Sequence, residues 1–126
     1  MMKAKSITYK VINETKQQTL GWQVEIASTF FTRLKGLLGR PELAIGSGLI
    51  IKPSNSIHSF FMKFSFDAIF LDDKNDIIYV VEELAPGKIV KPVANAVQVI
   101  ELPAGTIRLT GTATGDVLKV TKCSND

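Results

Sequence analysis

Residues 68–84 read AIFLDDKNDIIYVVEEL, two apolar runs on either side of a polar pentapeptide. Both runs have the length of a strand and are rich in β-branched and aromatic residues, which favour β-structure. The pentapeptide DDKND is typical of the polar tip of a hairpin. This stretch therefore predicts an antiparallel hairpin with strands over 68–71 and 77–84.

Further strands are predicted on both sides of this hairpin, from alternating apolar and polar residues or, at 49–51, from a short apolar run. They lie over residues 7–11, 20–26, 49–51, 97–102 and 117–120. In the strand at 20–26 the alternation places Trp22 on the inward face, as a core anchor. Few strands are separated by a full helix, so a parallel βαβ fold is not expected.

A helical period extends over residues 30–38. The stripe consists of Phe30, Phe31, Leu34, Leu37 and Leu38. Ser28 or Thr29 can cap its start, and Gly39 can end it. Gly36 within the stripe costs about 1 kcal/mol relative to Ala, so we expect it to allow close approach of another backbone. A short helical turn is predicted over 106–110.

These elements predict a mainly β (α+β) fold in a single domain over residues 1–126. The expected architecture is a two-sheet sandwich or a partly open barrel of short, largely antiparallel strands with one or two short helices. A hydrophobic fraction of 45% and a charged fraction of 21% exclude a disordered chain. No apolar run approaches the roughly 18 residues of a membrane helix, and no apolar leader follows the N-terminus. We therefore expect a soluble, cytoplasmic protein without membrane contact.

Charge and composition also limit the classes of ligand. The net charge is +3 and the basic residues are dispersed, so nucleic-acid binding is not expected. One histidine and one cysteine do not suffice for the usual zinc site. Gly46-Ser47-Gly48 leads into a strand, so it lacks the helix N-terminus of a phosphate-binding loop. We expect no metal and no cofactor.

Residues 53–67 read PSNSIHSFFMKFSFD and follow no regular period. Phenylalanines at this density usually form core, whereas a partly exposed set would line an apolar ligand groove. Phe60, Phe61 and Met62 are the candidates for the wall of such a groove. Lys63 is the single cation among them, which is too few for a platform that stacks single-stranded nucleic acid.

His58 is the one side chain that normally titrates near neutral pH. A Ser-His-Asp arrangement would have to use it, with Ser54, Ser56 or Ser59 as the nucleophile and Asp67 as the orienting acid. The alternative is a polar histidine of a loop that hydrogen-bonds to the backbone.

Asp67 and Glu101 each lie between apolar neighbours, where a charge is costly unless it is paired or hydrogen-bonded. Asp67 is either a general base or ligand contact with a raised pKa, or a group that binds backbone N–H groups of the irregular segment. For Glu101 the alternation favours solvent exposure, on the face opposite its neighbours. Arg33 and Arg40 are the candidates for pairing with either acid.

Four blocks of sequence, in order, resemble the domain of unknown function 192 family. They are AxxxxxRLKGLLGR at 27–40, IHSFFMKF to DAIFLD within 57–72, VIELPAG at 99–105 and the pair GD at 115–116. The resemblance covers about residues 6–121. The chain departs from the pattern at Leu38, where methionine is common, and at Ser65, where proline often stands. The resemblance implies a compact, mainly β domain, and the family has no assigned activity.

The leading functional hypothesis is a non-catalytic domain that binds a small molecule or a protein partner. Its groove would lie between residues 53–67 and the sheet, with the aromatic segment 60–62 at the wall. Among the residues that match the family motifs, Arg40, Asp67 and Glu101 would supply polar contacts.

The alternative hypothesis is a hydrolase-like enzyme that uses His58 with Asp67 or Glu101 as its acid/base partner. That use requires His58 within hydrogen-bond reach of an acid or a serine in an open cleft. Nucleic-acid binding is a weaker alternative and would show a steep dependence of affinity on salt.

Overall fold

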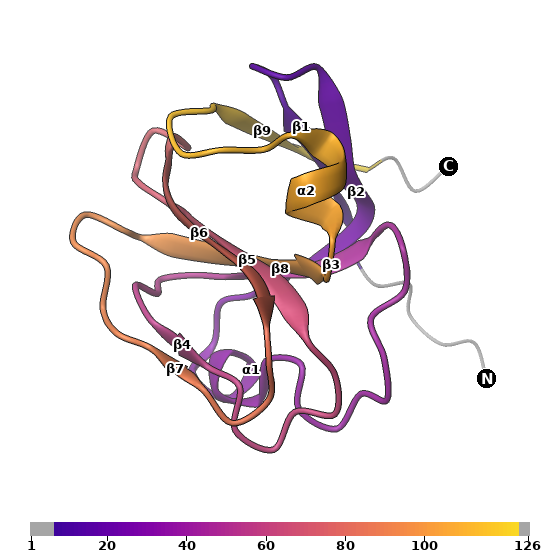
Figure 1. The fold of residues 1–126 in the computed structure, drawn as a ribbon, viewed down its shortest axis with the longest axis vertical. Coiled ribbons are helices and arrows are strands. Elements are labelled where there is room, and N and C mark those ends of the chain that lie inside the picture. The colour runs from indigo at the N-terminus through magenta and orange to yellow at the C-terminus, as the bar shows by residue number, and fades with distance from the viewer. Residues whose placement is uncertain (1–6, 124–126) are drawn as a thin grey trace.

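The computed structural model describes residues 7–123, mostly as strands; residues 1–6, where no leader segment was expected, and 124–126 lie outside this range. The strands of the main sheet are β1 (Tyr9–Asn13), β2 (Gln18–Ala27), β3 (Ser47–Ile51), β5 (Phe66–Leu71), β6 (Ile77–Leu84), β8 (Gln98–Pro103) and β9 (Leu118–Lys122). They follow the order β6-β5-β8-β3-β2-β1-β9. The sheet curls into a half-barrel (Figure 1), which confirms the predicted mainly β fold.

Neighbouring strands of this sheet are antiparallel, as predicted, except for β2 and β3. These two are parallel, and α1 (Phe30–Lys35) lies in the connection between them. The hairpin predicted over residues 68–84 is present as β5 and β6. At the far edges a bridge between Asp76 and Val117 brings the ends of β6 and β9 together. The curled sheet is therefore almost closed on one side.

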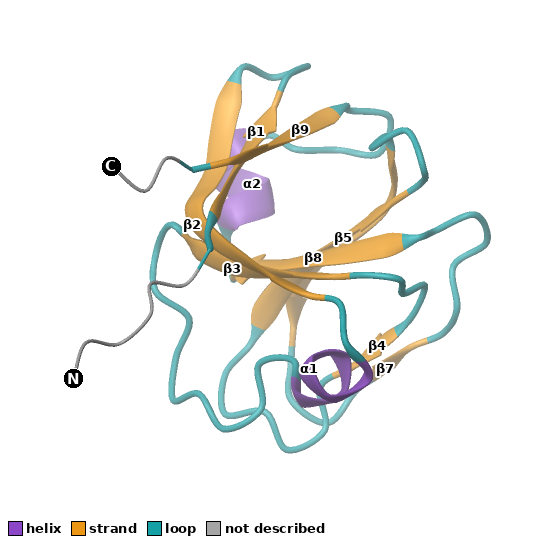
Figure 2. Ribbon diagram, turned by 180° about the vertical axis from the view of Figure 1, so that it is seen from behind, coloured by secondary structure: helices purple, strands orange, loops and turns teal. Residues whose placement is uncertain are grey.

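Apolar side chains pack on both faces of the sheet. One cluster includes Ile50, Ile69 and Ile100 and packs with Ile107 of α2 (Thr106–Thr110), which lies inside the curl. The second cluster, around Phe70, lies on the other face. The small antiparallel sheet of β4 (Ile57–His58) and β7 (Ile89–Val90) covers that face together with α1 (Figure 2). The central strands β5 and β8 consequently have little solvent contact on either face.

Trp22 does not point into the core as predicted, because its side chain is 49% exposed. The register of β2 against β1 shifts in this region, and the N–H groups of Trp22 and Gln23 both donate to the carbonyl oxygen of Gly46, at 2.9 Å. Such a bulge turns the side chain outward. The indole ring lies over Gly46, where a Cβ atom would be 2.3 Å from it.

The helix at residue 30 is shorter and less buried than the apolar stripe predicts. It is capped by Thr29 and ends at Lys35, and none of its residues is buried. Phe30, Phe31 and Leu34 are 66%, 78% and 60% exposed. Within the described range no helix is long and apolar enough to span a membrane.

Gly36 ends this helix with φ +50° and ψ −127°, a conformation that favours glycine. A Cβ atom at Gly36 would meet nothing closer than 3.9 Å, so the expected close approach of another backbone is wrong. The backbone conformation, rather than the lack of space, requires the glycine.

Asp67 is fully buried on β5 and connects two other segments of the chain. Its Oδ1 accepts the N–H of Glu83 and its Oδ2 accepts the N–H of Ile107, both at 2.8 Å. The first bond holds the irregular end of β6, and the second holds the first turn of α2. Asp67 therefore binds backbone N–H groups, as its structural hypothesis states, but these groups belong to β6 and α2 and not to the irregular segment 53–67.

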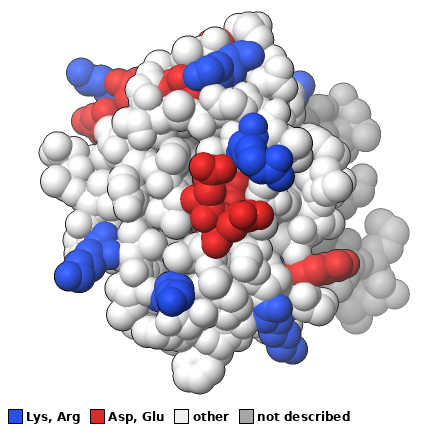
Figure 3. All heavy atoms as spheres, viewed as in Figure 1, with Lys and Arg blue, Asp and Glu red and all other residues white. Residues whose placement is uncertain are grey.

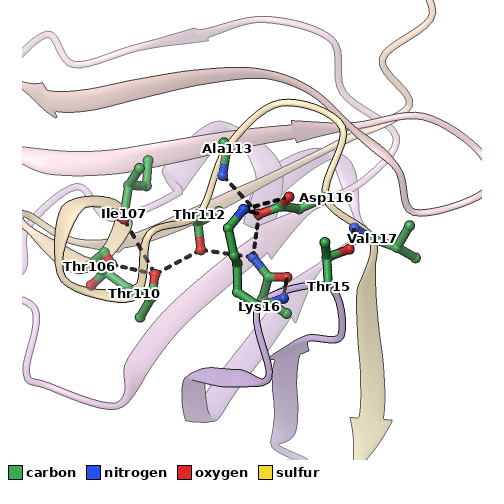
Figure 4. A network of polar contacts seen from close by, with 10 residues as sticks. Thr15, Lys16, Thr106, Ile107, Thr110, Thr112, Ala113, Asp116 and Val117 are labelled. Carbon is green, nitrogen blue, oxygen red and sulfur yellow. Dashed lines mark hydrogen bonds and ion pairs between the residues drawn. The ribbon is translucent and has the colours of Figure 1, made fainter.

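A second buried carboxylate joins the turn after β1 to the segment before β9 (Figure 4). Asp116 accepts hydrogen bonds from Asn13 Nδ2 at 2.9 Å and from Ala113 N at 3.0 Å, and it pairs with Lys16 Nζ at 2.9 Å. Burial raises the pKa of Asp116, but the hydrogen bonds from Asn13, Lys16 and Ala113 and the charge of Lys16 outweigh it. The net effect is a lowered pKa.

We expect Asp67→Asn to lower the free energy of unfolding by about 2–4 kcal/mol, because the new amide group would face one of the two N–H donors that now bind the carboxylate. Urea unfolding at neutral pH measures the change. The matched control is Asp73→Asn at the exposed tip of the hairpin, which we expect to change stability by less than about 0.5 kcal/mol. Equal stability of the two variants would contradict the structural role of Asp67.

We expect Asp116→Asn to lose stability at neutral pH but much less in acid. Because folding lowers the pKa of Asp116, its contribution is present above the ordinary value of 3.8 and is lost as the pH falls through the folded value. Urea unfolding at about pH 7, 4 and 2.5 follows the difference from the natural chain. A difference that stays constant over this range would refute the argument.

Candidate functional site

A cavity of about 120 Å³ lies between α1 and the chain around β4, where the sequence predicts a groove. We call it the α1–β4 cavity. Residues 33–38 form one wall. The others come from Ile51, Pro53, Ser54, Ser56, Ile57, His58, Met62 and Glu101. Segments from four parts of the sequence thus meet at one hollow.

Glu101 lines this cavity from β8 and is only 4% exposed. Its neighbours in the sheet are Leu49 of β3 and Ala68 of β5, so it lies in the middle of the sheet. The alternation correctly places its side chain opposite Ile100 and Leu102. However, that face carries the second apolar cluster and α1, so the predicted solvent exposure is wrong.

The carboxyl group of Glu101 has little compensation for its burial. Its Oε1 has no hydrogen-bond partner within residues 7–123. Burial raises the pKa of Glu101 from 4.5 to about 8, and the positive charge of Arg40 offsets only part of that effect. The group is therefore mainly protonated at neutral pH. A buried polar group without a partner is costly, and such groups are concentrated at functional sites.

Arg33 lines the same cavity from α1. Its Nη1 donates to the carbonyl oxygen of Pro53 at 3.0 Å, which anchors the guanidinium group. Its Nε is buried and, like the Glu101 oxygen, has no partner in the part of the chain that the structure describes. The sequence suggested Arg33 only as a partner for an acid. The feature of the sequence that could have indicated a place for Arg33 at the cavity was its position in the block RLKGLLGR, close to Gly36.

His58 also lines the cavity, but it does not form the predicted catalytic pairs. Its Nδ1 accepts the N–H of Phe60 at 3.3 Å, and the two rings stack with centroids 5.3 Å apart. The Ser54 hydroxyl donates to the carbonyl oxygen of Ser56, and the Ser59 hydroxyl binds the loop before β7. Within residues 7–123, no serine or acidic side chain hydrogen-bonds to His58.

The aromatic segment that was predicted to form a groove wall lies next to the cavity. Met62 lines it, and Phe60 adjoins it through the stacked His58 ring. Phe61 is 89% exposed and has φ +64°, a conformation that bulky residues rarely adopt. An exposed phenylalanine on a strained backbone is more typical of a binding surface than of a solvated loop.

Two predicted ligand contacts do not line the α1–β4 cavity. Arg40 pairs with Glu25, at 3.3 Å between Nη2 and Oε1, in an adjoining hollow. Asp67 uses both carboxylate oxygens to bind backbone N–H groups. A larger groove of about 730 Å³ between β6 and β7 is lined by none of the candidate residues.

We expect Glu101→Gln to stabilise the protein increasingly as the pH rises from about 4.5 to about 8. Because the folded chain holds the proton to higher pH than the unfolded chain does, the natural protein loses stability across this window, whereas glutamine does not titrate. The other charged or titratable residues that line the cavity are Arg33, Lys35 and His58, and all of them are retained.

The difference in the free energy of unfolding should grow by about 1.4 kcal/mol per pH unit at most. Urea unfolding at about pH 5, 6, 7 and 8 measures it, with the exposed Glu42→Gln as the matched control. A difference that does not change with pH would show that folding leaves the Glu101 carboxyl group ionised as usual.

The chain is similar to known proteins over most of its length. A family model described as "DUF192: Uncharacterized ACR, COG1430" matches residues 11–120. A UPF0127 protein of Thermococcus sibiricus (strain DSM 12597 / MM 739) is 34% identical over 110 residues, which cover 84% of this chain and 71% of that protein. A UPF0127 protein of Pyrococcus horikoshii is 35% identical over 112 residues, which cover 86% of this chain and 96% of that protein.

The fold is also present in a solved structure. A protein of unknown function from Novosphingobium aromaticivorans DSM 12444 matches with a TM-score of 0.79, over 90% of this chain and 84% of that one. Its sequence is 21% identical, so this likeness concerns the fold alone. The family match over residues 11–120 and the identities with the UPF0127 proteins confirm the resemblance seen in the motifs: the chain belongs to the DUF192 (UPF0127) family.

Proposed function

We propose that the protein is a binding domain for a small molecule and that the α1–β4 cavity is its binding site. The observation that carries this proposal is the buried Glu101, which lines the cavity and whose Oε1 no described residue binds. A polar atom without a partner in a packed core costs about 1–3 kcal/mol. A ligand that supplies the partner removes this cost.

The dimensions of the cavity support a ligand of few atoms. Its volume of about 120 Å³ is well below the roughly 300–1,000 Å³ of sites for drug-sized molecules. Apolar side chains such as Leu34 and Met62 surround the polar groups, as is usual in sites for small molecules. The exposed Phe60 and Phe61 extend this apolar surface beyond the cavity.

A hydrolase-like reaction is the second candidate, because His58 and Glu101 line one cavity. The hydrogen bond of His58 with the Phe60 backbone, in place of a serine or an acid, favours binding over catalysis. The two functions differ in their dependence on His58. A binding domain keeps its ligand in His58→Ala, whereas a hydrolase of this type loses its turnover.

The distribution of charge gives little support to nucleic-acid binding. On the face shown in Figure 3, lysine and arginine side chains are scattered around a central acidic group, and most of the surface is uncharged. A binding track for a phosphate backbone needs clustered cations.

We expect small fragments to shift the backbone amide signals of Gly36, Ser56, His58 and Glu101 in ¹H–¹⁵N correlation spectra of the labelled protein. Ser56→Leu should abolish these shifts, because the larger side chain fills part of the cavity. Thr114→Leu, in the exposed loop before β9, is the matched control and should retain them.

The spectra of both variants also report whether the fold is intact. Fragments that bind only in the β6–β7 groove, or that bind equally well to Ser56→Leu, would contradict the assignment of the site.

A further inference from the structure

We propose that the ligand of the α1–β4 cavity is a small carboxylate with a short apolar substituent, bound between the carboxyl group of Glu101 and the Nε–H of Arg33. This inference rests on the proposed function and specifies the chemical class of the ligand. Both residues line the cavity, and the Nε of Arg33 and the Oε1 of Glu101 are buried atoms without a partner in the described chain.

The hydrogen-bonding capacity of the two groups determines what the ligand must offer. Arginine has only donors, and the Nη1 of Arg33 is already bound to the carbonyl oxygen of Pro53, so the buried Nε–H requires an acceptor from the ligand. A protonated Glu101 offers one O–H donor. A carboxylate has two oxygens and can accept one hydrogen bond from each group, without any proton transfer.

The charges around the cavity favour an anion over a cation. Glu101 is the single acidic residue among those that line it, whereas Arg33 and Lys35 are cationic. The charge of Arg40 also acts on the Glu101 carboxyl group. With Glu101 protonated the site has a net positive potential, which attracts a carboxylate and repels an ammonium group.

The remaining walls determine the rest of the ligand. Leu34, Leu37, Ile51, Ile57 and Met62 offer apolar surface. A sulfate or phosphate ion has no apolar group to place against these side chains, whereas a carboxylate with a short alkyl chain has one. The volume of about 120 Å³ limits the ligand to a few atoms, as in a carboxylate with a chain of two or three carbons.

The test is a titration of the labelled protein with sodium butyrate, with butyramide and butylamine as uncharged and cationic probes of similar size. We expect butyrate to shift the cavity amides and to bind roughly tenfold or more tightly than either control, because both of its hydrogen bonds are charge-assisted. Its affinity should fall as the pH rises above about 8, where Glu101 loses its proton.

Variants of the two groups separate their contributions. Glu101→Gln retains an N–H donor, so it should keep butyrate binding but lose the dependence on pH. Glu101→Leu removes the donor, and Arg33→Lys keeps the charge but removes the Nε–H, so both should weaken binding roughly tenfold or more. Arg108→Lys on the exposed face of α2 is the matched control, and urea unfolding shows that each variant is folded.

The outcomes distinguish this inference from the proposed function. If butyramide or butylamine binds in the cavity as tightly as butyrate, or if Glu101→Leu binds butyrate unchanged, the assignment to carboxylates is wrong and the cavity remains a binding site. If neither these probes nor any fragment shifts the cavity amides, the proposed function fails as well.

Discussion

The packing of apolar side chains on both faces of β5 and β8 is the constraint on which the rest of the structure depends. A charged residue on either strand has little contact with solvent, so it must be paired, hydrogen-bonded or neutral. Asp67 and Glu101 lie on these paired strands, where Asp67 is opposite Leu102 and Glu101 is opposite Ala68. Asp67 is partnered by two backbone N–H groups, whereas Glu101 has a pKa raised by burial and an oxygen without a partner in the described chain. Asp67 therefore binds other segments of the chain, and Glu101 is the carboxyl group on which the proposed binding site rests.

The wall of the cavity opposite Glu101 depends on few contacts of its own. α1 has six residues and no buried side chain, and an isolated helix of this length is not stable in water. Its capping box at Thr29, the Arg33–Pro53 hydrogen bond and the burial of Leu37 hold it over the sheet. A ligand bound to both Arg33 and Glu101 would add a direct connection between this helix and the central strand.

Local features of the sequence were sufficient to predict the strands and the hairpin at 68–84. The residues that favour strands and the polar tip between them lie close together in the sequence. They were not sufficient to predict the direction of the Trp22 side chain. It points outward because of a bulge whose N–H groups bind the carbonyl oxygen of Gly46, more than twenty residues away. A period of two residues correctly placed Glu101 opposite its neighbours. This period does not indicate whether other segments cover that face of the sheet. The sequence therefore could not predict the burial of Glu101 or its raised pKa.

The parallel connection from β2 to β3, which the sequence did not predict, also forms one wall of the α1–β4 cavity. Because β2 and β3 are parallel, the chain between them must cross a face of the sheet, and α1 lies within that crossing. The crossing brings Gly36 over β8, where a Cβ atom would stand 3.9 Å from the Oε1 of Glu101. A larger side chain at Gly36 would strain the backbone, whose φ is +50°, and would extend toward that carboxyl group. Gly36 therefore ends the helix instead of lying within it, and its backbone conformation accounts for the glycine.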